Sequence, residues 1–401
     1  SEDDNGNSVD TGKLTITSGN ENGSNTGSLT ATGGGGSAGI GSAWSTGAVG
    51  SGAGTIKITG GSHGAGIGSG EWATGKTNIT ISDTAKINAR TDQYGAGIGS
   101  GNDTTGPTTV TITGGTIVEA VGGDLGDGIH SDGKLTISGG TIGTTQGGTG
   151  KSGGAGIYSK DDLSIESGTI GSLGTDGKTP DTTTGALGGT STAEAKGGNG
   201  IHSDGKISIT SGNIRNAKGG NATADYKSGG SGIYCGDALT ISGGTIGTAK
   251  GGDSTAGTGG DGIRSDDSKF TISGSTTGTA QLYTIGTAQG GNGTISGGKG
   301  IFGKTMEILA GTIIEKAIGG NSTGTGEKDT GGAGISASDS LAISGWGLPM
   351  KVGSRPVAVV SIRHTLPQSG TEPYHVGQTQ SGLVAMKGTP RFSRMQASSS
   401  F

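Results

Sequence analysis

The stretch Asp127-Gly-Ile-His-Ser-Asp-Gly-Lys-Leu-Thr-Ile-Ser-Gly-Gly-Thr-Ile142 contains one complete turn of the fold that this sequence predicts. Three short apolar segments begin in it, at Ile129, Leu135 and Thr141, and glycines separate them. Apolar and polar residues alternate within each segment, as in a β-strand with one buried face. Three such strands joined by glycine-rich bends form one triangular coil, which buries its apolar side chains by stacking on a neighbouring coil.

The Gly-Ile pair in this stretch occurs ten times, at spacings of 27 to 44 residues. The longer spacings come from inserts, such as residues 173–197, which lie just before the next pair. We therefore predict an all-β protein, a right-handed, three-faced parallel β-helix (β-solenoid) of about ten coils, whose hand follows from the bias of parallel crossover connections. The isoleucines of the ten pairs form one predicted interior column: Ile40, Ile67, Ile98, Ile129, Ile157, Ile201, Ile233, Ile263, Ile301 and Ile335.

Two further columns accompany these isoleucines. The residue before each is glycine, which suits a tight corner or a positive φ. The residue two positions after each is small, as an inward stack with a spacing of about 4.8 Å requires. This small-residue column contains Ser42, Ser69, Ser100, Ser131, Ser159, Ser203, Cys235, Ser265, Gly303 and Ala337. Because Cys235 is a member, we interpret it as a packing residue rather than a reactive thiol.

The composition agrees with a narrow core. Of the 401 residues 95 are glycine and only 27% are hydrophobic, which is too few for one thick globular core. The repeat places the β-helix at residues 13–345, after an N-terminal segment, 1–12, that we expect to be disordered. Residues 346–401 hold five of the seven prolines, so this atypical tail is a cap, a separate module or a misassembled terminus.

Charge and hydropathy exclude two classes of partner. Residues 1–345 carry a net charge of −10, whereas residues 346–401 carry +5. An acidic body argues against a nucleic acid as the partner. No apolar run in the sequence is long enough to predict a membrane-spanning segment.

The residue directly after each isoleucine points outward and is the most informative position for function. It is glycine in the first three coils and then becomes, in order, His130, Tyr158, His202, Tyr234, Arg264 and Phe302. Sugar rings present apolar C–H faces and hydroxyl edges, which aromatic, imidazole and guanidinium groups match. The sequence therefore predicts either a carbohydrate-binding strip or a row of side chains that stack on one another for stability.

Carboxylates accumulate beside this row of outward residues. Their positions are two residues before the isoleucine or three to four residues after it, and the members are Asp127, Asp132, Asp204, Asp261, Asp266 and Asp267. Ca²⁺ prefers several oxygen ligands held on tight bends, which makes these residues candidate metal ligands. The alternative is that aspartate serves here as a turn former.

Signals for catalysis are few. Parallel β-helices host polysaccharide lyases, and the combination of a base with calcium carboxylates that a lyase needs occurs only at Arg264 with Asp261, Asp266 and Asp267. Paired acids for a hydrolase occur at Asp161-Asp162 and at Asp266-Asp267. We therefore expect a protein without catalytic residues and keep a pectate-lyase-like polysaccharide lyase as an alternative.

The Asp-Gly-Ile-His-Ser-Asp-Gly-Lys sequence at 127–134, with its variants at 199–206 and 261–268, resembles a clostridial family of secreted carbohydrate-binding parallel β-helix proteins. The Gly-Ala-Gly-Ile-Gly-Ser-Gly units at 64–70 and 95–101 are similar to those of glycine-rich surface repeat proteins of gut Firmicutes. The resemblance covers roughly residues 12–345. It implies a pectate-lyase-like solenoid that binds cellulose or an acidic polysaccharide, with Ca²⁺ held by aspartates, in a secreted or cell-surface protein.

The resulting expectation is a non-catalytic, extracellular polysaccharide-binding surface protein whose partner is a polysaccharide or a cell-surface glycan. A structural adhesin or stalk made of repeats is the first alternative. An ice-binding solenoid is another, because outward threonines share a column that Lys57 and Glu307 interrupt. Those threonines are Thr80, Thr111, Thr136, Thr240 and Thr271.

Overall fold

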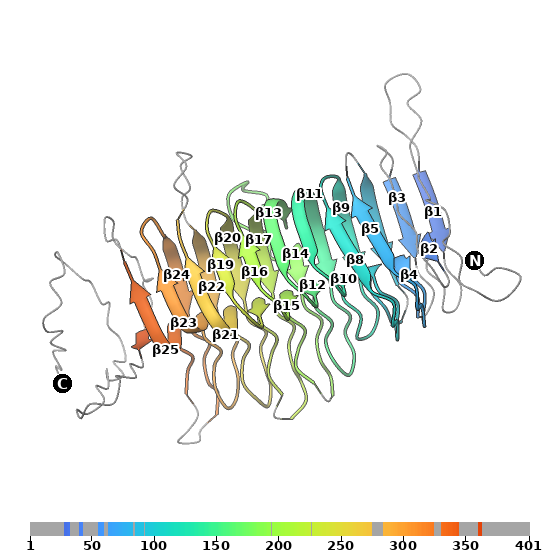
Figure 1. Ribbon diagram of the computed structural model, residues 1–401. Coiled ribbons are helices and arrows are strands. Elements are labelled where there is room, and N and C mark those ends of the chain that lie inside the picture. The colour runs from blue at the N-terminus through green and yellow to red at the C-terminus, as the bar shows by residue number, and fades with distance from the viewer. Residues whose placement is uncertain are drawn as a thin grey trace, which may run out of the picture.

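The computed structural model of the protein describes residues 28–32, 40–42, 55–59, 63–82, 85–91, 93–193, 195–225, 227–274, 284–324, 330–344 and 360–362. The regular structure of this part of the chain is β-strand, and the strands of successive coils pair in parallel along one axis (Figure 1). The predicted all-β parallel solenoid is confirmed, whereas its right hand stays a prediction. The predicted segment 1–12 and the tail 346–401, except residues 360–362, lie outside the described residues.

The first face begins at the Gly-Ile isoleucines. Its register joins each isoleucine to the next, from Ile40 to Ile335, and all ten side chains are buried. The predicted interior column is therefore confirmed. The strands are β2 (Ile40–Ser42), β4 (Ile67–Ser69), β7 (Ile98–Gly99), β10 (Ile129–Ser131), β12 (Ile157–Ser159), β15 (Ile201–Ser203), β18 (Ile233–Cys235), the first parts of β21 (Ile263–Ile272), β23 (Ile301–Ile308) and β25 (Ile335–Ile343), and β26 (Val360–Ile362), which pairs with β25.

In the described coils from Ile67 to Ile301, the second face contributes two buried inward apolar side chains, such as Leu239 and Ile241, which are completely buried. The later parts of β21, β23 and β25 belong to it, because these strands bend around the corner from the first face. Burial of each such side chain contributes roughly 1.5–3 kcal/mol. The remaining strands of the second face are β5 (Thr77–Ile81), β8 (Thr108–Ile112), the first parts of β11 (Leu135–Gln146) and β13 (Leu163–Ile170), β16 (Ile207–Ile209) and β19 (Leu239–Ile241).

The third face alternates a large and a small inward side chain, as at Ile246 and Ala249, both completely buried. Because the inward columns of all three faces meet in a narrow interior, each coil is stabilised mainly by its two neighbours. The strands of the third face, besides the later parts of β11 and β13, are β1 (Ser28–Thr32), β3 (Thr55–Thr59), β6 (Lys86–Arg90), β9 (Thr116–Val121), β14 (Gly185–Leu187), β17 (Asn213–Lys218), β20 (Thr245–Lys250), β22 (Ile285–Gln289) and β24 (Ile314–Ile318).

The small-residue column is buried wherever its side chains are described, and the side chain of Ser42 lies outside that part of the structure. Cys235 is completely buried, and its Sγ lies 3.3 Å from the carbonyl oxygens of both Gly205 and Ala238. Burial raises the pKa of the Cys235 thiol to about 11, so the reactive thiolate does not form near neutral pH. These observations support its interpretation as a packing residue.

Close packing, not positive φ, explains the glycines that precede the isoleucines from Ile67 to Ile301. Gly200 is not among the described residues with a positive φ. A Cβ on Gly200 would lie 2.6 Å from both the carbonyl oxygen of Gly232 and the backbone nitrogen of Lys218. Because those atoms belong to the backbone of neighbouring strands, they have no room to move aside. Of the two explanations that the sequence offered, a tight corner and a positive φ, the tight corner is therefore correct for Gly200.

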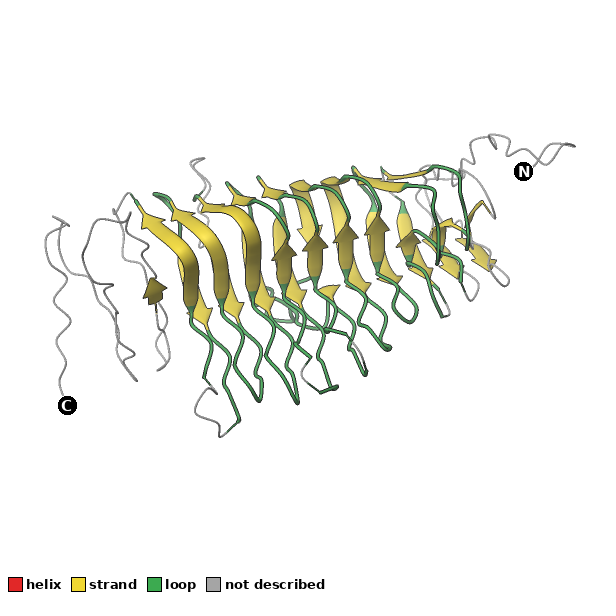
Figure 2. Cartoon of the chain, turned by 60° about the horizontal axis from the view of Figure 1, so that its bottom comes forward, coloured by secondary structure: helices red, strands yellow, loops and turns green. Residues whose placement is uncertain are grey.

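The inserts form an ordered layer of glycine. From Gly147 onward, each leaves the third face through one Gly-Gly pair and returns to the next isoleucine through another, as at Gly188-Gly189 and Gly197-Gly198. The predicted insert 173–197 is divided in two, because β14 within it pairs on the third face. The amide of Gly198 donates to the carbonyl of Gly189 at 2.8 Å within one insert, and the amide of Gly220 donates to the carbonyl of Gly198 at 2.7 Å between two inserts. Figure 2 shows these arms as a regular row beside the strands.

This glycine layer extends along most of the solenoid. A Cβ on Gly189 or on Gly198 would lie 1.8 Å from a carbonyl oxygen of the adjacent arm, so only glycine fits. The layer therefore explains much of the glycine content, which the sequence interpretation assigned to bends. One unbroken series of backbone hydrogen bonds joins Gly148, Gly154, Gly189, Gly198, Gly220, Gly230, Gly252, Gly260, Gly291, Gly298, Gly320 and Gly332.

The proposed ice-binding threonine column is less regular than the sequence predicts. Ser164 and Ser208 interrupt it in the middle, and Glu307 ends it. The assignment of Lys57 to this column is wrong, because Lys57 pairs with Asn88 on the third face. An ice-binding surface requires a regular array, so this face offers little support for that alternative.

Candidate functional site

The structure brings the predicted outward residues together in one row. They follow the buried isoleucines of the first face, and the strand register pairs each with the next. All of them are half-buried, so each exposes part of its planar group to solvent. We call this row the ring strip, and its members are His130, Tyr158, His202, Tyr234, Arg264 and Phe302.

Neighbouring groups of the ring strip contact one another. The ring centroids of Tyr158 and His202 are 5.0 Å apart at an interplanar angle of 89°, and those of His202 and Tyr234 are 4.7 Å apart at 81°. His130 lies 4.7 Å from Tyr158 in a tilted arrangement. Edge-to-face contacts of this kind are favourable because the positive ring edge meets the negative ring face. The predicted self-stacking is therefore present, and it fixes how each ring is presented.

The site repeats every two coils. In the coils of His130, His202 and Arg264, which we call basic coils, an Asp or Asn lies two residues before the isoleucine and an Asp lies three residues after it. The coils of Tyr158, Tyr234 and Phe302, which we call aromatic coils, carry other residues at these positions. Basic and aromatic coils alternate along the strip.

The first basic coil holds its histidine between two carboxylates. Nδ1 of His130 lies 2.7 Å from Asp127 and Nε2 lies 3.2 Å from Asp132. Burial alone would lower the pKa of His130, but the hydrogen bonds to Asp127 and Asp132 outweigh it and raise this pKa to about 9. Burial opposes ionisation of Asp132 as well, yet hydrogen bonds from His130 and Ser100 lower its pKa to about 2. His130 is therefore charged at neutral pH.

The second basic coil differs by one residue. Asn199 stands where the first has Asp127, and its amide Nδ2 lies 3.2 Å from Nδ1 of His202. Nε2 of His202 lies 2.9 Å from Asp204, in contact but without the alignment of a hydrogen bond. Burial lowers the pKa of His202, because the nearby Asp204 carboxylate only partly compensates for the lost hydration. The pKa values of two equivalent histidines are therefore shifted in opposite directions, so His130 is charged at neutral pH and His202 is mainly neutral.

The third basic coil holds a guanidinium. Nη1 of Arg264 lies 2.9 Å from Asp261 and Nε lies 2.6 Å from Asp266. Burial opposes the charge, but the two carboxylates outweigh it and raise the pKa of Arg264. The predicted lyase base is therefore held as a cation, which argues against that role. The guanidinium also lies 4.9 Å from the ring centroid of Phe302, where a cation–π interaction is favourable.

The second and third basic coils are joined to the aromatic coils on both sides, and the first is joined to the one aromatic coil that follows it. The Tyr158 hydroxyl donates to Asp204 at 2.6 Å, and the Tyr234 hydroxyl donates to Asp266 at 2.9 Å. In the other direction, the side chain two residues before the isoleucine accepts a backbone N–H from the following coil. These pairs are Asp127 with Ala155 at 2.5 Å, Asn199 with Ser231 at 2.7 Å and Asp261 with Lys299 at 2.6 Å.

The strip begins at His130 for a steric reason. In the preceding coils Gly68 and Gly99 have φ values of 144° and 132°, in the region that favours glycine. A Cβ on Gly99 would lie 2.0 Å from the carbonyl oxygen of His130. The change from glycine to planar side chains thus accompanies a change of backbone conformation.

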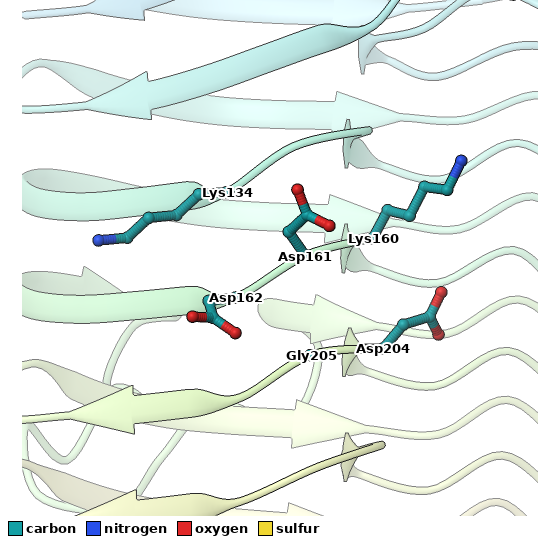
Figure 3. Close-up of a pocket in the computed structure, with 6 residues that line it drawn as sticks. All are labelled: Lys134, Lys160, Asp161, Asp162, Asp204 and Gly205. Carbon is teal, nitrogen blue, oxygen red and sulfur yellow. The ribbon is translucent and has the colours of Figure 1, made fainter.

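A shallow polar depression borders the strip. It has a volume of about 460 Å³ and is lined by Lys134, Lys160, Asp161, Asp162, Asp204 and Gly205. Figure 3 shows Lys134 and Lys160 pointing away from each other on either side of Asp161. Oδ1 of Asp162 accepts the backbone N–H of Lys206 at 2.9 Å, so Asp162 has a structural role. Asp204 lines this depression and also contacts Tyr158 and His202 of the strip.

The predicted calcium ligands already have partners. Asp127 and Asp132 hold His130, Asp261 and Asp266 hold Arg264, and Asp204 accepts from Tyr158. A side-chain cation thus stands between the carboxylates of one coil, where Ca²⁺ would have to bind, so these residues fit the ion poorly. The side chain of Asp267 lies outside the described residues. Within the described part of the chain, no three His, Cys, Asp or Glu side chains form a group suited to a metal ion.

Comparisons with protein-family models, with curated proteins and with solved structures found no match. The case for function therefore depends on the geometry of the ring strip. Among the described residues, no helix has the length and apolar character needed to cross a membrane.

The sequence interpretation missed two features of the site. Lys299 places its Nζ 5.1 Å from the ring centroid of Phe302, but its position two residues before Ile301 gave no signal by itself. Asn199 begins the variant of the repeat at 199–206 and stands in the position of Asp127, and the pKa of the neighbouring His202 is lowered where that of His130 is raised. Alignment of every second coil, instead of every coil, would have revealed both the Asp/Asn position and the alternation.

Exchange of Asp127 and Asn199 tests the electrostatics of the two histidines. In Asp127→Asn, the pKa of His130 is expected to fall from about 9, because one of its two carboxylate partners is lost. In Asn199→Asp, the pKa of His202 is expected to rise. NMR titration of the imidazole resonances measures both values, and unchanged pKa values in the two variants would contradict the assignment.

A stability measurement follows from the same pKa. The ordinary pKa of His130 is 6.5 and its folded value is about 9, so charged His130 stabilises the fold fully below about pH 6.5. This contribution, of up to about 3 kcal/mol, is lost as the pH rises through about 9. Urea unfolding of the parent should show this loss between about pH 6 and pH 10, and Asp127→Asn should show less of it. Equal pH dependence of the two proteins would contradict the prediction.

Proposed function

We propose that the protein is a non-catalytic, extracellular polysaccharide-binding protein of the bacterial surface, and that the ring strip is its binding site. The observation that carries the proposal is the unbroken row of six half-buried planar groups on one face. Neighbouring side chains orient each group, and carboxylates contact every member except Phe302. Such preorganisation favours binding, since little side-chain entropy remains to be lost.

The chemistry of the strip suits sugars. The tyrosine rings offer apolar faces to the C–H faces of pyranose rings. Asp204 and Asp266 accept the tyrosine hydroxyls with one oxygen each, and a carboxylate has capacity for further donors, such as sugar hydroxyls. Apolar faces beside fixed hydrogen-bond acceptors are typical of small-molecule recognition.

Replacement of Tyr158 and Tyr234 by alanine tests the proposal. Each ring is expected to contribute roughly 1 kcal/mol of stacking, so the double variant should bind the glycan at least about tenfold more weakly. A glycan array of the parent, with and without Ca²⁺, selects the probe, and titration calorimetry with that probe measures both proteins. Equal affinities of the parent and the double variant would overturn the proposal.

Tyr94→Ala is the matched control. Tyr94 stacks on His63 with ring centroids 5.1 Å apart, but it precedes Ile98 and does not belong to the strip. Its loss removes one ring stack of similar size without touching the proposed site. Affinity should therefore be retained in Tyr94→Ala, while any loss of melting temperature resembles that of a strip variant.

A structural stalk or adhesin is the second candidate. It is favoured by the internal pairing of the strip, since His130, Arg264 and both tyrosine hydroxyls have protein partners. In that case Tyr158→Ala/Tyr234→Ala should lower the melting temperature strongly, and the array should show no glycan bound by the parent. A ligand-binding strip predicts the opposite balance, with a large loss of affinity and a small loss of stability.

A further inference from the structure

We infer that the ligand of the ring strip is a linear, extended, uncharged glycan with a disaccharide repeat, which lies along the solenoid axis with one disaccharide on each pair of coils. This inference rests on the proposed function and specifies the class and the direction of the ligand. The observation behind it is the two-coil repeat of the strip. A surface that bound sugars through aromatic rings alone would not need such a repeat.

Tyr158 and Tyr234 are equivalent platforms. Each donates its hydroxyl to the aspartate of the following basic coil, and each ring meets His202 nearly at right angles, at 89° and 81°. They lie two coils apart, so their separation along the axis is about 10 Å. His202, between them, presents a different group in a different orientation.

A ligand that matches this pattern must itself repeat over two units. In an extended β-1,4-linked chain of pyranose sugars, successive rings face opposite ways, so the repeating unit is a disaccharide whose length is close to two coils. A ligand that lies across the axis would contact one coil only, so the alternation of basic and aromatic coils would not affect its affinity. A chain with a β-1,3 linkage curls and leaves the straight row of rings.

The charges of the strip favour an uncharged chain. His130 lies between Asp127 and Asp132, and Arg264 lies between Asp261 and Asp266. Each cation is therefore already balanced by carboxylates, which would repel an acidic sugar placed beside them. This result differs from the acidic polysaccharide that the family resemblance implies as one of its two options.

Titration calorimetry of the full chain with β-1,4-linked cello- and xylo-oligosaccharides of increasing length tests the inference. Affinity should rise several-fold with each completed pair of sugars and change little with each odd sugar. Six coils spaced by about 4.8 Å should accommodate roughly six sugars, beyond which affinity levels off. Equal gains for odd and even sugars, or equal binding of β-1,3-linked oligosaccharides, would overturn the inference.

A second variant separates this inference from the proposed function. His202→Tyr keeps a planar group at every position but removes the alternation between Tyr158 and Tyr234. The even-step dependence should then disappear, so that affinity changes by the same factor with each added sugar. If Tyr158→Ala/Tyr234→Ala abolishes binding but the parent shows no even steps, the proposed function stands and the two-coil register is wrong. If the parent binds none of the oligosaccharides and no glycan on the array, both fail.

Discussion

Alanine in place of Gly198 is expected to cost the protein more than about 3 kcal/mol of folding stability, although it adds a single methyl group. The added Cβ would lie 1.8 Å from the carbonyl oxygen of Gly154. That oxygen belongs to the neighbouring arm of the glycine layer and accepts the amide of Gly189 at 2.8 Å. Relief of the clash requires a shift of the backbone, which breaks hydrogen bonds in two coils at once.

Gly150→Ala is the matched control. Gly150 lies in the same kind of insert, but the nearest atom to its added Cβ would be a side-chain carbon of Asp124 at 3.5 Å, which is ordinary van der Waals contact. Its stability should therefore stay within about 0.5 kcal/mol of the parent. Urea unfolding measures both variants, and a Gly198→Ala protein as stable as Gly150→Ala would show that the layer is loosely packed.

The damage in Gly198→Ala should also be local. Each coil of a solenoid contacts mainly its two neighbours, so a defect in one insert destabilises the adjacent coils first. Hydrogen exchange should increase at Gly189, Gly198 and Gly220, whose amides form consecutive bonds of the layer. Amides near Ile301, several coils away, should keep their protection.

The interior of the solenoid was predictable because it depends on local alternation. A buried column needs the same kind of residue at the same place in each coil, and the Gly-Ile pair provides that marker in the sequence. The glycine layer was not predicted, since its hydrogen bonds join residues of different inserts, such as Gly198 and Gly220. The paired glycines on both sides of each insert were the signal, but they look like ordinary flexible loops when one coil is considered alone.

The candidate site, like the interior, was predictable only in part. The row from His130 to Phe302 follows from one outward position per coil, so the sequence predicts its members and their order. Their partners were not predictable, because side chains such as Asp127 and Asp261 bond to the backbone of the next coil. Spacing within one coil carries no information about which atoms of the next coil lie opposite, so these aspartates were interpreted as calcium ligands or turn formers.

The Asp-or-Asn position therefore has two roles that can be separated. Its oxygen accepts a backbone N–H from the next coil in all three basic coils, and both residue types can do this. Only aspartate adds a negative charge beside the basic group of its own coil. Aspartate accompanies His130 and Arg264, whose pKa values are raised, whereas asparagine accompanies His202, whose pKa is lowered.

Asp261→Ala is expected to be the most damaging change in the ring strip. Asp261 is buried, and its two oxygens accept the backbone N–H of Lys299 at 2.6 Å and Nη1 of Arg264 at 2.9 Å. Alanine would leave the Lys299 N–H without its acceptor and would remove one of the two carboxylates that hold the Arg264 guanidinium. Loss of one member of a buried ion pair costs about 3 kcal/mol or more, so the unfolding free energy should fall by that order.

Variants taken from the second basic coil serve as controls. Asp261→Asn keeps an acceptor for Lys299 and should cost clearly less than Asp261→Ala, although its amide would face the Arg264 guanidinium. Asp261→Asn/Arg264→His reproduces the pairing of Asn199 with His202 and should recover most of the remaining loss, because a neutral histidine needs no second carboxylate. Urea unfolding near neutral pH compares the three variants with the parent. If Asp261→Ala were as stable as the double variant, the cross-coil acceptor would contribute nothing, and Asp261 would be a turn former only.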